Sequence, residues 1–204
     1  MIDGTGWCYI AVFVLFAAAL CTLPLLRHRQ WKAFASRRGG TVGSVLRQPS
    51  LEFSYHSRPV VVKSGGRNES AGVVATFSWP GRNLRLECRE NGWLSGISQT
   101  NERELKQVET GDADFDEAYL LYGHTADEAN AFFGEATRHS FLRLYDAWHL
   151  RPTLSIEDGE LRVHRSHSIW TSKGLEKMIE PVLEFYDIAL ANHSPENGQH
   201  GSWS

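Results

Sequence analysis

The stretch TLSIEDGELRVHR, residues 153–165, carries the strongest local fold signal in this sequence of 204 residues. Apolar and polar residues alternate on both sides of Asp158 and Gly159, as they do in strands that bury one face. An Asp-Gly pair readily adopts the positive φ angles of a two-residue hairpin turn. The stretch therefore predicts two antiparallel strands joined by a tight turn.

A long helix is expected after this hairpin. From Leu175 to Leu190 the apolar residues form a single stripe at helical spacing. Thr171 or Ser172 is the expected N-cap, because hydroxyl oxygens accept hydrogen bonds from the first N–H groups of a helix. Pro181 lies inside the pattern and predicts a kink or a restart of the helix.

One strand and two helices are expected before the hairpin. Residues 118–122 form a short apolar run that suits a strand, and residues 126–148 carry apolar side chains at helical spacing. Gly134 is expected to divide the second segment into two helices. Residues 113–191 therefore predict a β-α-α-β-β-α half.

The preceding segment, residues 41–90, predicts an antiparallel β-meander. Residues 51–62 suit one hairpin around a short HSRP connection, and residues 73–88 suit a second around the turn WPGRN. Residues 91–112 are rich in Gly, Ser and Asn and then in charged residues. We interpret them as a linker, with a short helix expected around ERELKQV. The predicted fold class is α+β.

The first 40 residues have a different character. WCYIAVFVLFAAALCTLPLL, residues 7–26, contains no charged residue, and a helix of this length spans the roughly 30 Å of bilayer hydrocarbon. We interpret it as a transmembrane helix, because residues 1–6 lack the basic residues that begin a cleaved signal peptide. A basic juxtamembrane helix is expected at residues 27–40, ended by the two glycines 39 and 40. Trp31 is expected at the bilayer interface.

Orientation follows from the basic residues, all of which lie on the C-terminal side of the span. The positive-inside rule then predicts a single-pass protein of the inner (cell) membrane, with a short extracytoplasmic N-terminus. A soluble, cytoplasmic α+β domain is expected at residues 41–191, followed by a disordered tail at residues 192–204. Cys88 is the single cysteine outside the span, so no disulfide is expected within the domain, as suits a reducing compartment.

Charge excludes one class of partner. Residues 1–40 hold five of the 21 Lys and Arg residues and one of the 24 Asp and Glu residues. The remainder therefore has 16 basic and 23 acidic residues, a net charge of −7. Such a domain repels nucleic acid, so the expected partners are the lipid bilayer, through residues 7–26, and a protein that the sequence does not identify.

The stretch GDADFDEAYLLYG, residues 111–123, is the densest group of carboxylates. It does not match an EF-hand loop, because Glu117 and Gly123 occupy the positions of the turn glycine and the last ligand. A looser divalent-metal site remains as a hypothesis, with Asp114, Asp116 and His124 as its candidate ligands. The alternative is a solvated turn before a strand, in which Asp114 or Asp116 caps backbone N–H groups.

No catalytic residue and no cofactor is predicted. The sequence contains no HExxH, CxxC, phosphate-binding P-loop or dinucleotide-binding glycine pattern. The histidine pair in HRSH, residues 164–167, follows a strand and is a weak zinc signal, because such a site needs three or four ligands.

The order of these features resembles a family of uncharacterised bacterial membrane-anchored proteins. The first matching motif is FD-x-A-(F/Y) before a strand, and the second is a hairpin of the LSIEDGELRV type. The matching residues are Asp114, Phe115, Asp116, Ala118, Tyr119, Ile156, Asp158, Gly159, Leu161 and Val163. The resemblance covers residues 110–190. It implies a membrane anchor and this architecture, and it implies no activity.

Together these observations favour a binding or scaffolding role for a membrane-anchored protein with a cytoplasmic α+β domain. The alternative is an enzyme whose divalent-metal site is assembled from scattered carboxylates and histidines.

Overall fold

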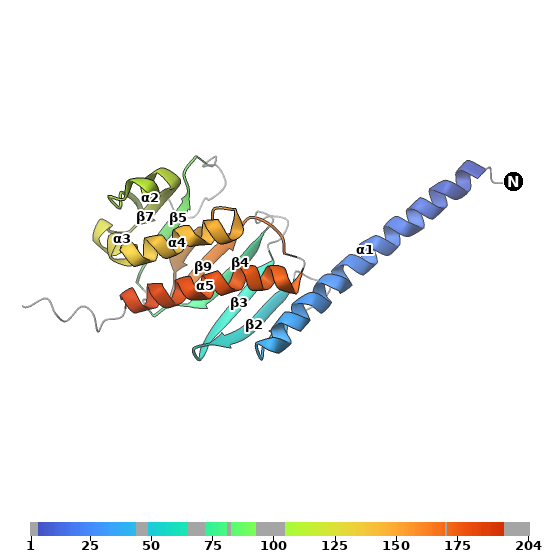
Figure 1. The fold of residues 1–204 in the computed structure, drawn as a ribbon, viewed down its shortest axis with the longest axis horizontal. Coiled ribbons are helices and arrows are strands. Elements are labelled where there is room, and N and C mark those ends of the chain that lie inside the picture. Colours follow the sequence, from blue (N-terminus) through green and yellow to red (C-terminus); the bar gives the residue numbers. More distant parts are fainter. Residues whose placement is uncertain are drawn as a thin grey trace, which may run out of the picture.

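The computed structural model describes residues 4–43, 49–64, 72–80, 83–92, 105–169 and 171–193, and this part of the chain forms one antiparallel sheet and five helices (Figure 1). The helices are α1 (Gly4–Arg37), α2 (Ala113–Ala118), α3 (Ala126–Phe132), α4 (Glu135–Trp148) and α5 (Ser172–His193). The strands are β1 (Thr41–Val42), β2 (Ser50–Tyr55), β3 (Arg58–Ser64), β4 (Val73–Ser78), β5 (Leu86–Glu90), β6 (Lys106–Val108), β7 (Tyr119–Gly123), β8 (Thr153–Glu157) and β9 (Glu160–Arg165). The predicted α+β class is confirmed.

The nine strands form a single sheet in the order β1-β2-β3-β4-β9-β8-β5-β7-β6. The hairpin predicted from TLSIEDGELRVHR is the β8–β9 pair, with Glu157 opposite Glu160. Asp158 has a φ of 54° and Gly159 a φ of 76°, so the turn adopts the positive angles that Asp-Gly favours. This hairpin lies at the centre of the sheet.

The β-meander predicted for residues 41–90 is wrong in one respect. Strands β2, β3 and β4 do follow one another, but β4 pairs with β9, and β5 pairs with β8 and β7. The β8–β9 hairpin therefore lies between β4 and β5. It provides apolar pairs on both sides, because Phe77 of β4 faces Leu161 and Leu86 of β5 faces Ile156. The turn signal in WPGRN correctly predicted that the chain reverses after β4. It could not predict which strand pairs with β4.

Two smaller expectations are also corrected. Lys106–Val108, at the end of the predicted linker helix, is strand β6 and pairs with β7. Ala113–Ala118, expected as an extended approach to a strand, is helix α2, because Asp112 provides an N-cap at its start. The predicted division by Gly134 is confirmed, since Gly134 is the N-cap of α4. Helix α5 runs through Pro181 without a restart.

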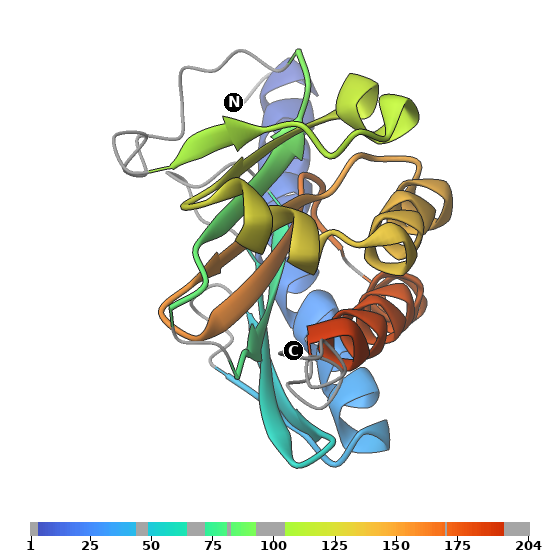
Figure 2. The same ribbon diagram turned by 90° about the vertical axis from the view of Figure 1, so that its left-hand side faces the viewer.

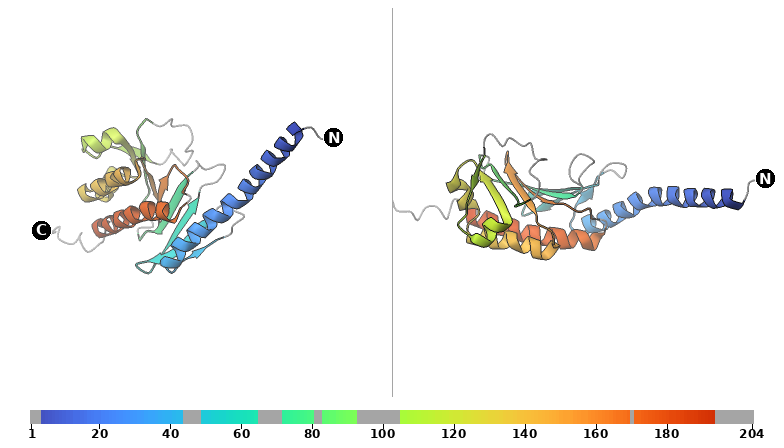
Figure 3. Two further views of the ribbon diagram at one scale, coloured as in Figure 1. Left: turned by 45° about the vertical axis from the view of Figure 1, so that its right-hand side comes forward. Right: turned by 90° about the horizontal axis from the view of Figure 1, so that it is seen from above.

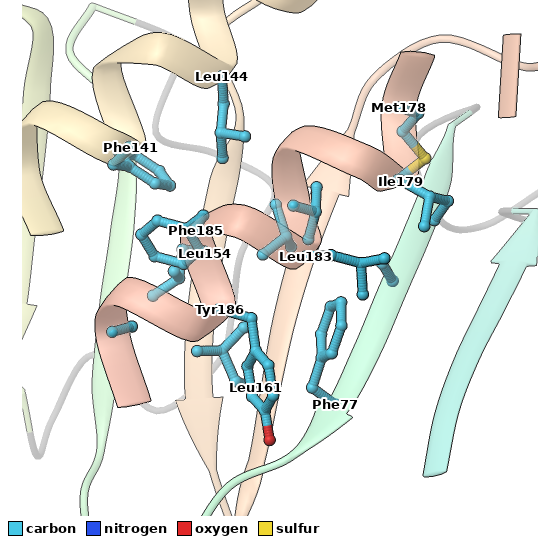
Figure 4. Packing of buried hydrophobic residues seen from close by; sticks show 14 of the residues in the cluster. Phe77, Phe141, Leu144, Leu154, Leu161, Met178, Ile179, Leu183, Phe185 and Tyr186 are labelled. Atoms are coloured by element: carbon cyan, nitrogen blue, oxygen red, sulfur yellow. The ribbon is translucent and has the colours of Figure 1, made fainter. Parts of the chain in front are cut away.

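The helices cover one face of the sheet, as Figures 2 and 3 show, and the core lies between the two layers. Figure 4 shows this packing under α5, where Phe77 of β4 stacks on Tyr186 with ring centroids 4.7 Å apart. Phe185 of α5 meets Phe141 of α4 at 5.5 Å. The Tyr186 hydroxyl donates a hydrogen bond to the carbonyl oxygen of Ser78, at 2.6 Å, so this buried ring also satisfies its polar atom.

Helix α1 is part of this core. Trp31 and Phe34 are fully buried, and the Trp31 Nε1–H donates a hydrogen bond to the carbonyl oxygen of Ile169, at 3.2 Å. The expectation that Trp31 lies at a bilayer interface is therefore wrong, since the domain itself buries the ring. The predicted helix end is confirmed: Gly39 has a φ of 64°, and the Gly40 N–H donates to the carbonyl oxygen of Ala35.

The N-terminal part of α1 projects away from the sheet (Figure 1). Within the residues that the structure describes, no helix combines the length and the apolar character that crossing a bilayer requires. Most side chains of the predicted transmembrane span, residues 7–26, lie outside the described residues, and so do residues 194–204 of the predicted tail. Asn192 and His193, which were expected in that tail, belong to α5.

Candidate interaction surface

The sheet has a second face, which none of the described helices covers (Figure 3). We call it the uncovered face. Its central row takes one side chain from each of eight strands, and successive members of the row are register partners. From β2 to β6 this row is Glu52, Val61, Thr76, Arg162, Ser155, Glu87, Tyr122 and Gln107. The row is polar except for Val61 and Tyr122. On seven of these strands the residues directly before and after the row member are buried and lack polar side chains, whereas on β6 Lys106 is exposed and Val108 is buried.

Exposed charges lie on this face near the turn of the central β8–β9 hairpin. Arg162 of β9 pairs with Glu160 at 2.6 Å, and both side chains are nearly half exposed. Arg85 lies 3.9 Å from Glu157 of β8. Pairs this exposed add little to folding stability. They are available to exchange partners with a second molecule, which a buried pair is not.

An arginine and an aromatic ring lie on strands β5 and β7 of the same face. The Arg89 guanidinium of β5 donates a hydrogen bond to the Tyr122 hydroxyl of β7, at 2.8 Å, and its central carbon lies 4.6 Å from the centre of the same ring. Both residues are half-buried. Arg and Tyr are enriched at the energetic centres of protein interfaces, because each combines a large contact area with polar atoms.

The carboxylates of GDADFDEAYLLYG have local structural partners. Asp116 accepts hydrogen bonds from the N–H groups of Thr110 and Gly111 and from the Thr110 hydroxyl, at 2.9–3.1 Å. Asp112 accepts from the Phe115 N–H at 3.2 Å and from Arg138 Nε at 3.1 Å. The Phe115 N–H, together with the charge and hydrogen bond of Arg138, holds the pKa of Asp112 below its ordinary value. The predicted capping by Asp116 is confirmed, and Asp112 takes the helix cap.

The remaining metal candidates are spread out. Asp114 is exposed in the first turn of α2, and His124 is exposed in the connection between β7 and α3. Among the residues that the structure describes, no group of three or more His, Cys, Asp or Glu side chains is arranged to hold a metal ion. A divalent-metal enzyme thus gains no support from these residues. The metal site stays a prediction that elemental analysis would test.

The Cys88 thiol does not resemble a nucleophile. It is fully buried in β5, and burial raises its pKa well above the ordinary value, as does the nearby charge of Glu87. The thiolate that would react is therefore disfavoured. The lone cysteine outside the predicted span is a core residue.

Sequence reasoning missed Arg162, Arg89 and Tyr122 as a group. The alternation in ELRVHR did contain part of the signal, because it sets Arg162 on the opposite side of its strand from Leu161. Alternation does not, however, predict the order of the strands in the sheet. Only the insertion of β9 and β8 between β4 and β5 brings these side chains onto one continuous surface.

Comparison with known proteins finds a similar fold but no related sequence. No protein-family model matches the chain, and neither does any curated protein. The crystal structure of the mycobacterial trehalose monomycolate transport factor A has a similar fold, with a TM-score of 0.57. The two sequences are 12% identical, and the alignment covers 81% of this chain and 95% of that one. At this identity the likeness is one of fold.

Proposed function

We propose that this protein is a membrane-anchored binding protein associated with a transport system. In this proposal residues 7–26 hold it in the inner membrane, its domain lies in the cytoplasm, and the uncovered face docks a protein partner. Support for the anchor comes from the uncharged run at residues 7–26 and the basic residues that follow it.

The observation that carries the proposal is the continuity of α1. One helix runs from Gly4 to Arg37, and its last turns are a wall of the core, with Trp31 and Phe34 fully buried. The same turns are tied to α5, because Arg37 pairs with Glu176 at 2.9 Å. No flexible linker separates the proposed anchor from the domain. The domain would therefore be held in one orientation, which suits docking onto a neighbouring membrane complex.

The transport association is supported by the structural neighbour, whose name describes a transport factor. That protein shares the fold over almost its full length. Neither the described residues nor the sequence motifs favour an enzyme, so we propose no second function.

Charge reversal on the uncovered face tests the proposal. A photoreactive residue placed at position 122 of the full chain should crosslink a specific partner in native membranes. Arg162→Glu should lower the yield of that crosslink by about tenfold or more, because like charges across an interface repel and its centre is desolvated. Arg143→Glu is the matched control. Arg143 is also an exposed arginine in an ion pair, with Glu184 at 2.9 Å, but it lies on α4 in the helical layer.

Absence of a specific crosslink from position 122 would exclude the uncovered face as the docking surface, and equal yields in R162E and wild type would exclude Arg162 from the contact. Localisation has a separate readout. A reporter fused after Ser204 should fractionate with membranes and behave as cytoplasmic, and alkaline phosphatase activity of that fusion would overturn the orientation. Recovery of the full chain in the soluble fraction would overturn the anchor.

A further inference from the structure

A pocket of about 300 Å³ lies where the C-terminal part of α1 meets strand β1. His28, Lys32 and Ser36 line it from successive turns of the helix, and Thr41 lines it from the strand. Residues four apart on a helix share one side, so these three α1 side chains form a continuous polar wall. Ala35, Gly40 and Val42 complete the lining.

The pocket is basic, and among the residues that the structure describes no acidic side chain lines it. Two other cations at the end of this helix are neutralised. Arg37, its last residue, pairs with Glu176 of α5, and Arg38, directly after it, pairs with Glu180. Lys32 is exposed and has no acidic partner among the described residues. The basic residues after Leu26 therefore have two roles. Arg37 and Arg38 attach this part of the chain to α5, and Lys32 places a positive charge at the pocket.

A second observation concerns a polar atom of a residue in the pocket wall. The Nδ1 atom of His28 is buried and has no hydrogen-bond partner within the described part of the chain. A buried polar atom without a partner is unfavourable, and such atoms in native proteins call for an explanation. The Thr41 side chain, which is exposed, likewise makes no hydrogen bond among the described residues. Lys32 and the Thr41 hydroxyl thus provide a positive charge and a hydrogen-bond donor that a ligand in the pocket can reach.

The source of the ligand depends on the proposed membrane anchor. If residues 7–26 span the bilayer, the position of the pocket along α1 indicates which phosphate-containing molecules it would meet. Along a helix that rises 1.5 Å per residue, His28 lies about 3 Å and Lys32 about 9 Å beyond Leu26, the end of the proposed span. The headgroup layer on each side of a bilayer is roughly 5–8 Å thick. His28 would therefore lie at the depth of the lipid phosphates. Lys32 would lie just beyond that layer and reach back into it, because its long side chain tilts toward the N-terminus of the helix.

We infer that this pocket binds a phosphate group, and that its depth favours the headgroup of an anionic phospholipid over free phosphate. Lys32 supplies the charge, and the exposed Thr41 hydroxyl donates a hydrogen bond to a phosphate oxygen. Bound lipid would hold α1 and β1 at a fixed height relative to the bilayer.

Native mass spectrometry of the purified full chain in detergent tests this inference, with phosphatidylglycerol, phosphatidylcholine and inorganic phosphate as the added probes. Phosphatidylglycerol should be retained in preference to phosphatidylcholine. Lys32→Gln should weaken its retention by about tenfold or more, because both charge and a direct contact are lost. Thr41→Val, which changes no charge, should weaken it by about fivefold, the effect of losing one hydrogen bond.

Arg29→Gln is the matched control, because Arg29 carries the same charge on the same exposed segment and does not line the pocket. General attraction to anionic lipid predicts a loss of no more than about fivefold in this variant. Equal losses in K32Q and R29Q, together with no effect of T41V, would overturn the pocket. Inorganic phosphate binding that equals lipid binding and is lost in K32Q would overturn the lipid assignment.

This outcome is separable from that of the proposed function. Detergent-solubilised protein reports lipid binding whether or not the uncovered face docks a partner. Membrane fractionation of the cell, by contrast, reports the anchor alone. If the chain fractionates as a soluble protein, the depth argument fails, and preference for inorganic phosphate is then the expected result.

Discussion

On strand β3, Val62 is fully buried beneath the helices, whereas Val61, the residue before it, is only partly buried and lies on the uncovered face. The same contrast recurs across the sheet. On the covered face Phe77 and Leu161 face each other in a closed apolar layer, while their neighbours Thr76 and Arg162 face each other in the open.

The difference between these faces separates two tasks. The covered face holds the fold together by burying apolar area, at about 25 cal/mol per Å². The uncovered face contributes little to that area, so its residues are free to serve contact with another molecule. Residue type alone does not tell which role a position has, since both residues are valines. Which face of the sheet the side chain lies on determines whether it serves the core or the surface.

The valine pair gives the largest expected effect. Val62→Ala should lower the free energy of unfolding by about 2 kcal/mol, because buried methyl groups are lost and a cavity remains. Val61→Ala removes the same atoms from the same strand and should cost less than about 1 kcal/mol. Urea titration of the full chain in detergent, followed by tryptophan fluorescence, measures both. Equal losses would mean that the uncovered face is itself part of a core.

A second pair of substitutions, with a smaller expected loss of stability, tests whether α1 is held on the sheet as firmly as α4 is. Trp31→Phe should cost about 1–2 kcal/mol, because the ring shrinks and the Ile169 carbonyl loses its donor. Trp148→Phe on α4 is the control. Trp148 is also buried, but its Nε1–H has no hydrogen-bond partner among the described residues, so its removal relieves an unpaired donor.

The Trp148→Phe variant should therefore lose less than about 1 kcal/mol in the same urea titration. If the two substitutions cost the same, the bond from Trp31 to Ile169 would contribute nothing to stability, and α1 would be held by shape alone.

The smallest expected effect concerns the carboxylate of Asp112, which caps helix α2 and belongs to neither face of the sheet. The pKa of Asp112 is lowered in the folded state by the Phe115 N–H and by Arg138. Its contribution to stability is therefore present above the unfolded value of about 3.9 and is lost as the pH falls through the lowered folded value. Asp112→Asn keeps an N-cap residue but removes this titration. Its stability should decline less steeply than that of the wild type below about pH 4.

At pH 7 this variant should lose less than about 1 kcal/mol, as expected for a partly exposed ion pair. Asp146→Asn, at an exposed position on α4, is the matched control, because it removes a carboxylate from a neighbouring helix without touching the α2 cap. Thermal unfolding measured across the acid range distinguishes the two variants. Parallel profiles for wild type and D112N would show that Asp112 does not couple folding to pH.

The sequence was informative wherever a single segment determined the outcome. The Asp158-Gly159 turn, the end of α1 at Gly39 and the division at Gly134 all depend on φ angles or spacing within a few residues. The existence of most strands followed from alternation for the same reason. These features could be predicted because local chemistry alone fixes them.

Strand neighbours could not be predicted in this way. Whether β4 lies beside β5 or beside β9 depends on the comparison of two distant pairings, and alternation makes both compatible. The interaction surface depends on that choice, so Arg89 and Arg162 could not be assembled from sequence. Trp31 illustrates a related limit. An aromatic residue among arginines suits a bilayer interface and a core equally well until its neighbours are known.

The central place of the β8–β9 hairpin has a consequence for how the protein is made. Strand β4 ends at Ser78, and its partner β9 leaves the ribosome about 90 residues later, on the order of 10 s at typical rates of synthesis. During that interval the edge of β4 is open, as is β5. The last quarter of the chain then closes the middle of the sheet, so a ribosome that stops early releases two unjoined edges already tethered to α1. A chaperone that shields strand edges would act on this protein before its C-terminus appears.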